Sequence, residues 1–225
     1  QLETLSSKKD VEFAEPNYLV EIQGTSNDPR VISEETWGLL GTSASSSFGA
    51  NASAAWANGY TGSKAVYVGV IDSGIDVTHP DLAANVWVNS GEIAGNGIDD
   101  DANGFVDDIN GYDFLNGDGS VFDAGEHPHG THVAGTIGAV GGNGVGVAGV
   151  TWNVNLISAK IANQQGASTT VDAIRAIDYV TMLRTKKGLD IIASNNSWGG
   201  TGYSKALEDA IKRGGDAGIL FVAAA

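Results

Sequence analysis

The stretch that decides the fold is Ala65–Ile71, AVYVGVI, which runs directly into Asp72-Ser73-Gly74. Its residues are nearly all apolar and several are β-branched, which is typical of a strand buried on both faces of a parallel sheet. Asp72 therefore falls at the carboxyl end of a buried strand. Open α/β sheets bind their ligands at that edge.

Three further apolar runs are expected to form strands, over Val154–Ile161, Leu189–Ser194 and Gly218–Ala224. Helical patterns lie between them. Ser168 is the expected N-cap of a helix that ends in basic residues before Gly188, and a second helix is expected over Tyr203–Arg213. The alternation predicts an α/β fold, with a doubly wound, mainly parallel sheet flanked by helices.

The 225-residue chain is acidic, with 27 Asp and Glu against 12 Lys and Arg and a formal net charge of -15. This charge repels a phosphate backbone and disfavours a nucleic-acid partner. No apolar run approaches the length of a membrane span, so no membrane partner is expected. The length suits one globular domain or slightly more, which we expect to be a monomer. The absence of Cys excludes disulfides, thiolate metal sites and a Cys nucleophile.

The acidic residues are concentrated in the middle of the chain. Between Lys64 and Lys160 there is no Lys or Arg, and we call this segment the central acidic stretch. It holds thirteen carboxylates: Asp72, Asp76, Asp81, Glu92, Asp99, Asp100, Asp101, Asp107, Asp108, Asp113, Asp118, Asp123 and Glu126. Compact folding would crowd these charges unless cations lie among them. The pattern favours a calcium requirement, with calcium rather than internal ion pairs offsetting the charge.

One candidate calcium loop is residues 99–108, DDDANGFVDD, inside a Gly-, Asp- and Asn-rich segment, residues 89–118, that is expected to be a long functional loop. The order of oxygen-bearing residues follows an EF-type loop, with Gly104 at the turn. Asn110 stands where that loop carries a bidentate Glu. The alternative is a solvated acidic loop without a metal. The expected ligands are Asp99, Asp101, Asn103, the carbonyl of Phe105, and Asp107 or Asp108.

Two segments carry the residue types of acid–base catalysis: Asp72-Ser73-Gly74 and His129-Gly130-Thr131-His132. An Asp at a buried strand end can orient an imidazole, and a His at the start of a small-residue helix can be held beside it. Such a pair is a general base that lacks a nucleophile. His132 is expected to be structural. A zinc site of His127, His129 and His132 is the alternative, disfavoured because no H-E-x-x-H is present.

These motifs resemble the subtilisin-like serine proteases, from about Asp28 to the last residue. The resemblance implies that Asp72, in D-[ST]-G, is the catalytic aspartate and that His129, the first His of H-G-T-H-x-A-G, is the catalytic histidine. It also implies a secreted, extracellular protein that acts on polypeptide substrates. The matching S-x-G-G segment, whose backbone pairs with a substrate strand, implies four substrate-binding residues: Ser197, Trp198, Gly199 and Gly200.

The resemblance extends to both ends of the chain. In the family, A-A-A is followed by Gly-Asn, which supplies an oxyanion donor, and later by G-T-S-x-A with the nucleophile; both would lie beyond Ala225. The fold is therefore expected to be incomplete at the C-terminus and the chain itself inactive. VEFAEPNY, residues 11–18, resembles the end of an inhibitory propeptide. We expect residues 1–23 to be a propeptide remnant of a zymogen and residues 24–225 to be the N-terminal portion of the catalytic domain.

The resemblance also implies a second calcium site, formed by Asp28, Asp81 and Asn143 with backbone carbonyls. A third is expected around Asp113, Asn116 and Asp118. The expected function is serine endopeptidase chemistry, of which this chain would be a fragment. The alternative is a noncatalytic calcium- or peptide-binding pseudoprotease. A dinucleotide-binding oxidoreductase is disfavoured because Asp-Ser-Gly-Ile-Asp, not G-x-G-x-x-G, follows the first strand.

Overall fold

One five-stranded parallel sheet forms the centre of the structure, a computed structural model that describes residues 26–224 apart from 42–47, 124 and 201. The expected propeptide remnant, residues 1–23, lies outside the described residues. The sheet order is β2-β3-β1-β4-β5, and every pairing is parallel. The strands are β1 (Gly62–Asp72), β2 (Gly111–Asp113), β3 (Asn153–Lys160), β4 (Ile191–Asn196) and β5 (Leu220–Ala223).

Four of these strands overlap the four apolar runs of the sequence, and the doubly wound α/β fold is confirmed. The chain enters the sheet at its centre with β1, adds β2 and β3 on one side, and later crosses to add β4 and β5 on the other. This reversal of direction opens a crevice at the carboxyl ends of the central strands. Asp72, the last residue of β1, stands there.

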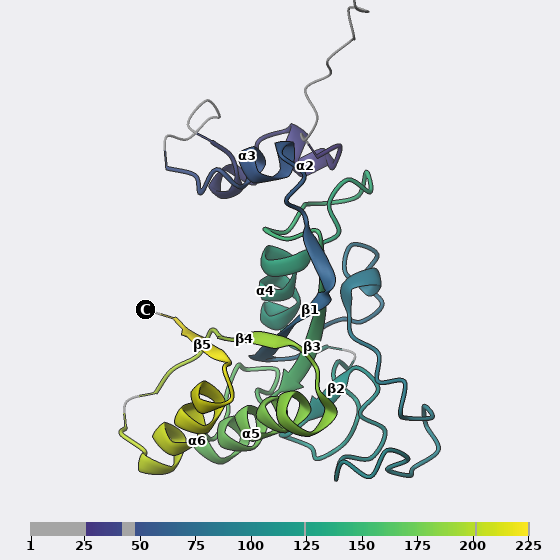
Figure 1. Cartoon of the computed structure of the whole chain (residues 1–225), viewed down its shortest axis with the longest axis vertical. Helices are drawn as coiled ribbons and strands as arrows, with labels where there is room; N and C mark the ends of the chain where they lie inside the picture. The colour runs from purple at the N-terminus through teal and green to yellow at the C-terminus, as the bar shows by residue number, and fades with distance from the viewer. Residues whose placement is uncertain (1–25, 42–47, 124, 201, 225) are drawn as a thin grey trace, which may run out of the picture.

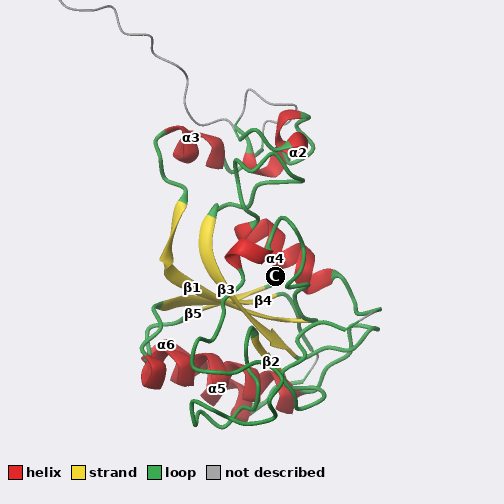
Figure 2. Ribbon diagram, turned by 90° about the vertical axis from the view of Figure 1, so that its right-hand side faces the viewer, coloured by secondary structure: helices red, strands yellow, loops and turns green. Residues whose placement is uncertain are grey.

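Helices cover the two faces of the sheet (Figure 2). One face is covered by α4 (His129–Gly138), and the other by α5 (Thr170–Lys187) and α6 (Lys205–Asp216). Between α4 and the sheet, Val70 and Leu156 pack with Ala134 in one buried cluster. Ile71 belongs to the larger cluster beneath α5. The carboxyl end of β1 is therefore buried on both faces, as its apolar sequence predicts, whereas residues 62–65 at its amino end are exposed.

The long helices begin and end at residues suited to those positions. The hydroxyl of Thr169, one residue after the expected Ser168, accepts the N–H of Asp172 at the start of α5. The helix ends at Gly188, whose φ of 74° is in the left-handed region that glycine adopts without strain. Ser204 makes the corresponding cap on α6. No described helix is long and apolar enough to cross a membrane.

Shorter elements lie near the amino end of β1 (Figure 1). They are α2 (Pro29–Ile32), the 3₁₀ helix η1 (Trp37–Leu39) and α3 (Ala52–Ala57); a second 3₁₀ helix, η2 (Ala83–Asn85), follows β1. Trp56 of α3 is buried and its ring centroid lies 5.3 Å from that of Trp152, just before β3. This contact joins the N-terminal helices to the sheet.

One part of the sheet keeps an apolar face exposed. Phe221 of β5 packs into the cluster beneath α5 and α6, so Leu220 and Val222 point to the opposite face. On that face α4 packs against β1 and β3. Leu220 and Val222 are 67% and 43% exposed.

Candidate active site

The candidate site is built on a short contact between Asp72 and His129. His129 Nδ1 lies 2.7 Å from Asp72 Oδ1. Asp72 is 5% exposed, whereas the His129 side chain is 45% exposed. With the aspartate ionised, Nδ1–H donates to it and leaves Nε2 as a proton acceptor facing the solvent side. The geometry is that of a general base whose ring orientation and tautomer are fixed.

A close approach of two backbone segments brings this pair together. Gly74, with a φ of 101°, turns the chain after β1, and Gly130 is the second residue of α4. A Cβ on Gly130 would lie 2.3 Å from the carbonyl oxygen of Gly74, closer than real Cβ atoms come to backbone. Glycine at position 130 is thus what allows α4 to begin against the turn.

Ser73 fastens the two segments to each other. Its backbone N–H donates to Asp72 Oδ1 at 2.7 Å. Its hydroxyl donates to the carbonyl of His127 at 2.8 Å and accepts the N–H of Gly130 at 3.0 Å. Ser73 therefore serves as a structural link between the strand end and the helix start.

A cleft of about 260 Å³ opens beside the pair. The segment that follows β4 forms one wall of the cleft. Three of the four expected substrate-binding residues, Ser197, Trp198 and Gly199, line the cleft there. The fourth, Gly200, is exposed. The ring of Trp198 stands edge-on to Phe221, with centroids 6.2 Å apart. The lining residues are Asp72, Ser73, His127, His129, Ile161, Ala162, Gly166, Ser168, Ser197, Trp198 and Gly199.

The other histidines occupy separate positions. His127 lines the cleft, with its ring centroid 6.1 Å from that of His129. His132 is exposed on α4. In the part of the chain that the structure describes, the histidines form no cluster with metal-ligand geometry. The expected zinc alternative therefore has no geometric support.

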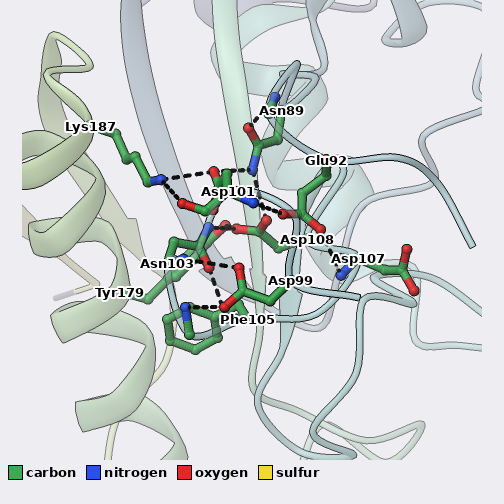
Figure 3. A network of polar contacts seen from close by, with 12 residues as sticks. Asn89, Glu92, Asp99, Asp101, Asn103, Phe105, Asp107, Asp108, Tyr179 and Lys187 are labelled. Atoms are coloured by element: carbon green, nitrogen blue, oxygen red, sulfur yellow. Dashed lines mark hydrogen bonds and ion pairs between the residues drawn. The ribbon is translucent and has the colours of Figure 1, made fainter. Parts of the chain in front are cut away.

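The candidate calcium loop gathers a different set of carboxylates from the one the sequence predicts (Figure 3). Oxygen atoms of Glu92, Asp99 and Asp101 lie within 4.8 Å of one another, and we call these residues the carboxylate cluster. Glu92 was not among the expected ligands. Its two carboxylate oxygens accept the backbone N–H groups of Asp101 and Asp107, at 3.0 and 3.1 Å.

Asp107 and Asp108 lie outside the cluster. Asp107 has a φ of 56°, and its carboxylate accepts the N–H groups of Gly95, Asn96 and Gly97 instead. Asp108 is fully buried and accepts hydrogen bonds from the side chains of Asn89, Asn103 and Tyr179. Burial raises the pKa of Asp108 to about 6 despite these bonds.

The remaining loop residues are oriented by their own contacts. Asn103 Oδ1 accepts the N–H of Phe105 at 2.8 Å. The Phe105 ring packs edge-on against Tyr112, Phe114 and Tyr179. These aromatic contacts anchor the loop to the core beneath α5.

Ion pairs correct the expectation that no side chain neutralises the central acidic stretch. Lys187, near the end of α5, places Nζ 3.0 Å from Asp101 Oδ2 and 2.9 Å from the Asp101 carbonyl. Lys160 pairs with Asp113, Asp123 and Glu126. Both lysines lie outside the stretch in the sequence, but the fold places them in contact with its carboxylates.

The same contacts change the expected third calcium site. Asp113 Oδ2 lies 2.8 Å from Lys160 Nζ, and its Oδ1 accepts the N–H groups of Leu115 and Asn116. Asp118 bonds the N–H of Ser120. Of the three expected ligands, Asp113 is thus already paired with a lysine ammonium, while Asn116 and Asp118 do not contact Lys160.

The second expected set, Asp28, Asp81 and Asn143, does converge. Asp28 is fully buried, and its carboxylate accepts the N–H groups of Gly142, Asn143 and Gly144. Asp81, 2% exposed, accepts the Asn143 side-chain amide at 2.9 Å. Among the described residues, neither carboxylate has a cationic side-chain partner.

An imidazole held by a buried carboxylate at the carboxyl edge of a parallel sheet is an arrangement used by serine hydrolases. The family model described as the Subtilase family matches residues 63–225, which is more than half of the chain. The chain belongs to the subtilase family.

Individual relatives agree with this assignment. Subtilisin-like protease 1 of Plasmodium berghei (strain Anka) is 40% identical over 154 residues, which cover 68% of this chain and 24% of that protein. Subtilisin DY of Bacillus licheniformis is 36% identical over 169 residues, 75% of this chain and 49% of that protein. Among solved structures, Sphericase is similar with a TM-score of 0.57 and 25% identity, covering 72% of this chain and 46% of that one. The matched part of the chain thus covers 24–49% of the length of these relatives.

Replacing Gly130 tests the close approach at the site. We expect Gly130→Ala to lower the free energy of unfolding by about 1–3 kcal/mol, because the new methyl group must displace backbone at Gly74. Gly135→Ala is the matched control, since its Cβ would meet nothing within 4 Å in the same helix. Urea unfolding measures both variants. Equal stability of the two would contradict the steric argument.

Because the carboxyl group of Asp108 is buried, we expect the free energy of unfolding to depend on pH when a chelator keeps the protein free of metal ions. Its pKa is about 6 in the folded protein and about 3.9 when unfolded. The folded state therefore binds the proton more tightly than the unfolded state does. The contribution of Asp108 to the free energy of unfolding is complete below about pH 4 and is lost as the pH rises to about 6. Relative to Asp108→Asn, the wild type should lose on the order of 2 kcal/mol across this window in urea unfolding. Asp100→Asn, which changes an exposed carboxyl of the same loop, should keep the wild-type slope; a wild-type slope in Asp108→Asn would refute the assignment.

Proposed function

We propose that this chain supplies the aspartate and histidine of a secreted serine endopeptidase that cleaves polypeptides by acyl transfer. The observation that carries the proposal is the 2.7 Å contact of His129 Nδ1 with Asp72 Oδ1 beside a cleft. In this mechanism His129 Nε2 takes the proton of a serine hydroxyl and later delivers it to the leaving amine. Asp72 keeps the ring in the required tautomer and stabilises the imidazolium.

The substrate is proposed to bind as an extended strand along residues 197–200. Three of these residues line the cleft next to His129, which supports that position. Backbone pairing of this kind recognises the polypeptide main chain rather than particular side chains. The expected propeptide, residues 1–23, is proposed to occupy the same groove before it is removed.

The nucleophile is proposed to come from a segment outside these 225 residues. Two observations support this. Among the described residues, no serine hydroxyl bonds the Nε2 atom of His129. The exposed Leu220 and Val222 form an uncovered apolar surface on the face of the sheet that carries α4, where a further segment of chain is proposed to pack.

A noncatalytic, peptide-binding or calcium-binding protein is the second candidate. It is favoured by the same observation: Ser168 and Ser197 line the cleft, but no serine hydroxyl among the described residues bonds Nε2 of His129. The two candidates differ in one property: only the endopeptidase has a serine that reacts with electrophiles when the chain is extended.

Labelling by a fluorophosphonate probe separates these candidates. The 225-residue chain should not label, whereas a chain extended through a G-T-S-x-A segment should label and cleave casein. His129→Ala and Asp72→Asn should each reduce turnover of the extended enzyme by several orders of magnitude, about 10⁴ for the aspartate change. His132→Ala is the matched control and should leave turnover near that of the wild type. Labelling of the short chain, or a larger loss in His132→Ala than in His129→Ala, would show that the assignment is wrong.

Calcium is proposed as the structural cofactor of this protein. The carboxylate cluster fits a hard cation, because it offers oxygen ligands and because Asp101 Oδ1 is buried without a hydrogen-bond partner among the described residues. The set of Asp28, Asp81 and Asn143 also fits, since it joins two buried carboxylates to an exposed side-chain amide and neither carboxylate has a cationic side-chain partner among the described residues. A bound calcium ion would supply fixed positive charge that joins loop segments distant in sequence.

Removing calcium should therefore destabilise the protein. A ligand that binds only the folded state contributes about 2.7 kcal/mol at a hundredfold excess over its Kd. Chelation should lower the melting temperature and open residues 89–118 to proteases first. Asp101→Ala should reproduce the local part of this effect.

The Asp101 variant also loses the ion pair with Lys187, so a second variant is needed. Lys187→Gln removes the ion pair but retains the carboxylate cluster, and it should still take up calcium in titration calorimetry. Asp100→Ala, in the same loop but outside the cluster, should behave like the wild type. No calcium uptake by metal-stripped wild type, with an unchanged melting temperature on refilling, would rule out the cofactor.

A further inference from the structure

Lys160 is a fully buried lysine that the proposed chemistry does not use. It is the last residue of β3 and stands beside Asp72 in the register of the sheet. The next residue, Ile161, donates its N–H to the carbonyl of Asp72 at 2.8 Å. A Cβ on Gly74 would lie 3.3 Å from Lys160 Cδ, so the lysine stem packs under the turn that follows Asp72. Lys160 is thus a direct neighbour of the strand end that carries the candidate aspartate.

The Lys160 ammonium joins three segments of the chain. Its Nζ lies 2.8 Å from Asp113 Oδ2 at the end of β2 and 2.6 Å from Glu126 Oε1 before α4. Asp123 is more distant at 3.6 Å and is half exposed. Asp113 and the Glu126 side chain are 0% and 7% exposed.

The ammonium form is favoured in this environment. Burial acts to lower the pKa of Lys160, but hydrogen bonds and charge interactions with Asp113 and Glu126 outweigh it and raise the pKa. A neutral side chain at this position would leave two buried carboxylates without a cation. Such carboxylates move towards water or take up protons.

Glu126 connects this ion cluster to the candidate histidine. It precedes His129 by three residues, and His127 and Pro128 form the only connection between them. Two contacts hold the connection against the sheet: Ser73 Oγ bonds the carbonyl of His127, and Lys160 holds Glu126. If the second contact is lost, Glu126 can turn to solvent and carry the start of α4 with it.

We propose that Lys160 is a positioning residue for the Asp72–His129 pair. Its ammonium holds Glu126 in place, and through residues 126–128 it fixes where α4 begins and therefore where the imidazole of His129 meets Asp72. This role rests on the proposed function, because it assigns a further residue to the same site.

An NMR measurement on the 225-residue chain tests the hydrogen bond between His129 and Asp72 directly. In protein labelled with ¹⁵N-histidine, the Nδ1–H proton of His129 should give a strongly downfield resonance while it is bonded to Asp72. Glu126→Gln and Lys160→Met should move this resonance upfield or lose it through exchange with water in protein that remains folded. Lys160→Arg, which retains the positive charge, should restore it.

Matched controls separate positioning from loss of stability. Asp123→Asn changes the distant, half-exposed partner of Lys160 and should keep the resonance. Lys64→Met removes another lysine, one that bonds Asn85 Oδ1 and the Val154 carbonyl at the amino ends of β1 and β3, the opposite end of the strands from Lys160; it should lower stability and keep the resonance. If Lys160→Met does not fold, the His129 resonance of Glu126→Gln decides whether the ion cluster positions the Asp72–His129 pair.

The extended enzyme supplies a second readout. Glu126→Gln should lower kcat by about 10–100-fold with KM nearly unchanged, because a displaced base affects the chemical step more than peptide binding. A wild-type resonance in folded Lys160→Met and Glu126→Gln would overturn the positioning role. A wild-type chain without the resonance would contradict the Asp72–His129 pair and this role together. An extended enzyme that is inactive while the resonance responds as expected would refute only the endopeptidase activity.

Discussion

The structure depends on the contact between the turn after β1 and the first residues of α4. Gly74 and Gly130 bring two backbone segments so close that a single methyl group on residue 130 would collide with a carbonyl oxygen. Because the segments touch, a carboxylate at a strand end and an imidazole at a helix start can share a hydrogen bond of 2.7 Å. The cleft, the segment after β4 and the ion cluster of Lys160 are all arranged around this contact. The site is therefore preorganised by backbone packing rather than by flexible side chains.

Local patterns in the sequence were sufficient for most of the fold. The run Ala65–Ile71 lies in β1 and is buried on both faces at its carboxyl end, residues 69–71, while Ala65 is exposed; the other apolar runs form most of β3, β4 and β5. β2 was missed because it has three residues and exists by pairing with β3, which no local pattern reports. The N-cap of α5 is Thr169 and not the predicted Ser168. Both residues carry a hydroxyl group, so the sequence does not distinguish them and only the helix geometry does.

The candidate sites also contain both residues that the sequence predicts and residues that it does not. Asp72 and His129 could be recognised because each lies in its own short motif. Glu92 could not, because it joins Asp99 and Asp101 through a loop whose path the sequence does not specify. Asp107 fits the spacing of a calcium loop, yet its left-handed backbone conformation turns its carboxylate towards the N–H groups of residues 95–97.

Some of the charges of the central acidic stretch are balanced by lysines from elsewhere in the chain. Lys160 and Lys187 contact four of its thirteen carboxylates, Asp101, Asp113, Asp123 and Glu126, so counting charges along the sequence overstated the deficit of positive charge. Asp28, Asp81 and Asp99 have no such lysine among the described residues. The case for a cation is therefore strongest at these carboxylates and weakest at Asp113.

Asp72 and His129 are proposed to form the acid–base pair of a serine endopeptidase. A crystal structure of the extended protein after reaction with a fluorophosphonate would show whether they do. We expect one modified serine, located within hydrogen-bonding distance of His129 Nε2, with Nδ1 still bonded to Asp72. A modified serine remote from His129, or an imidazole turned away from Asp72 in the reacted protein, would contradict it.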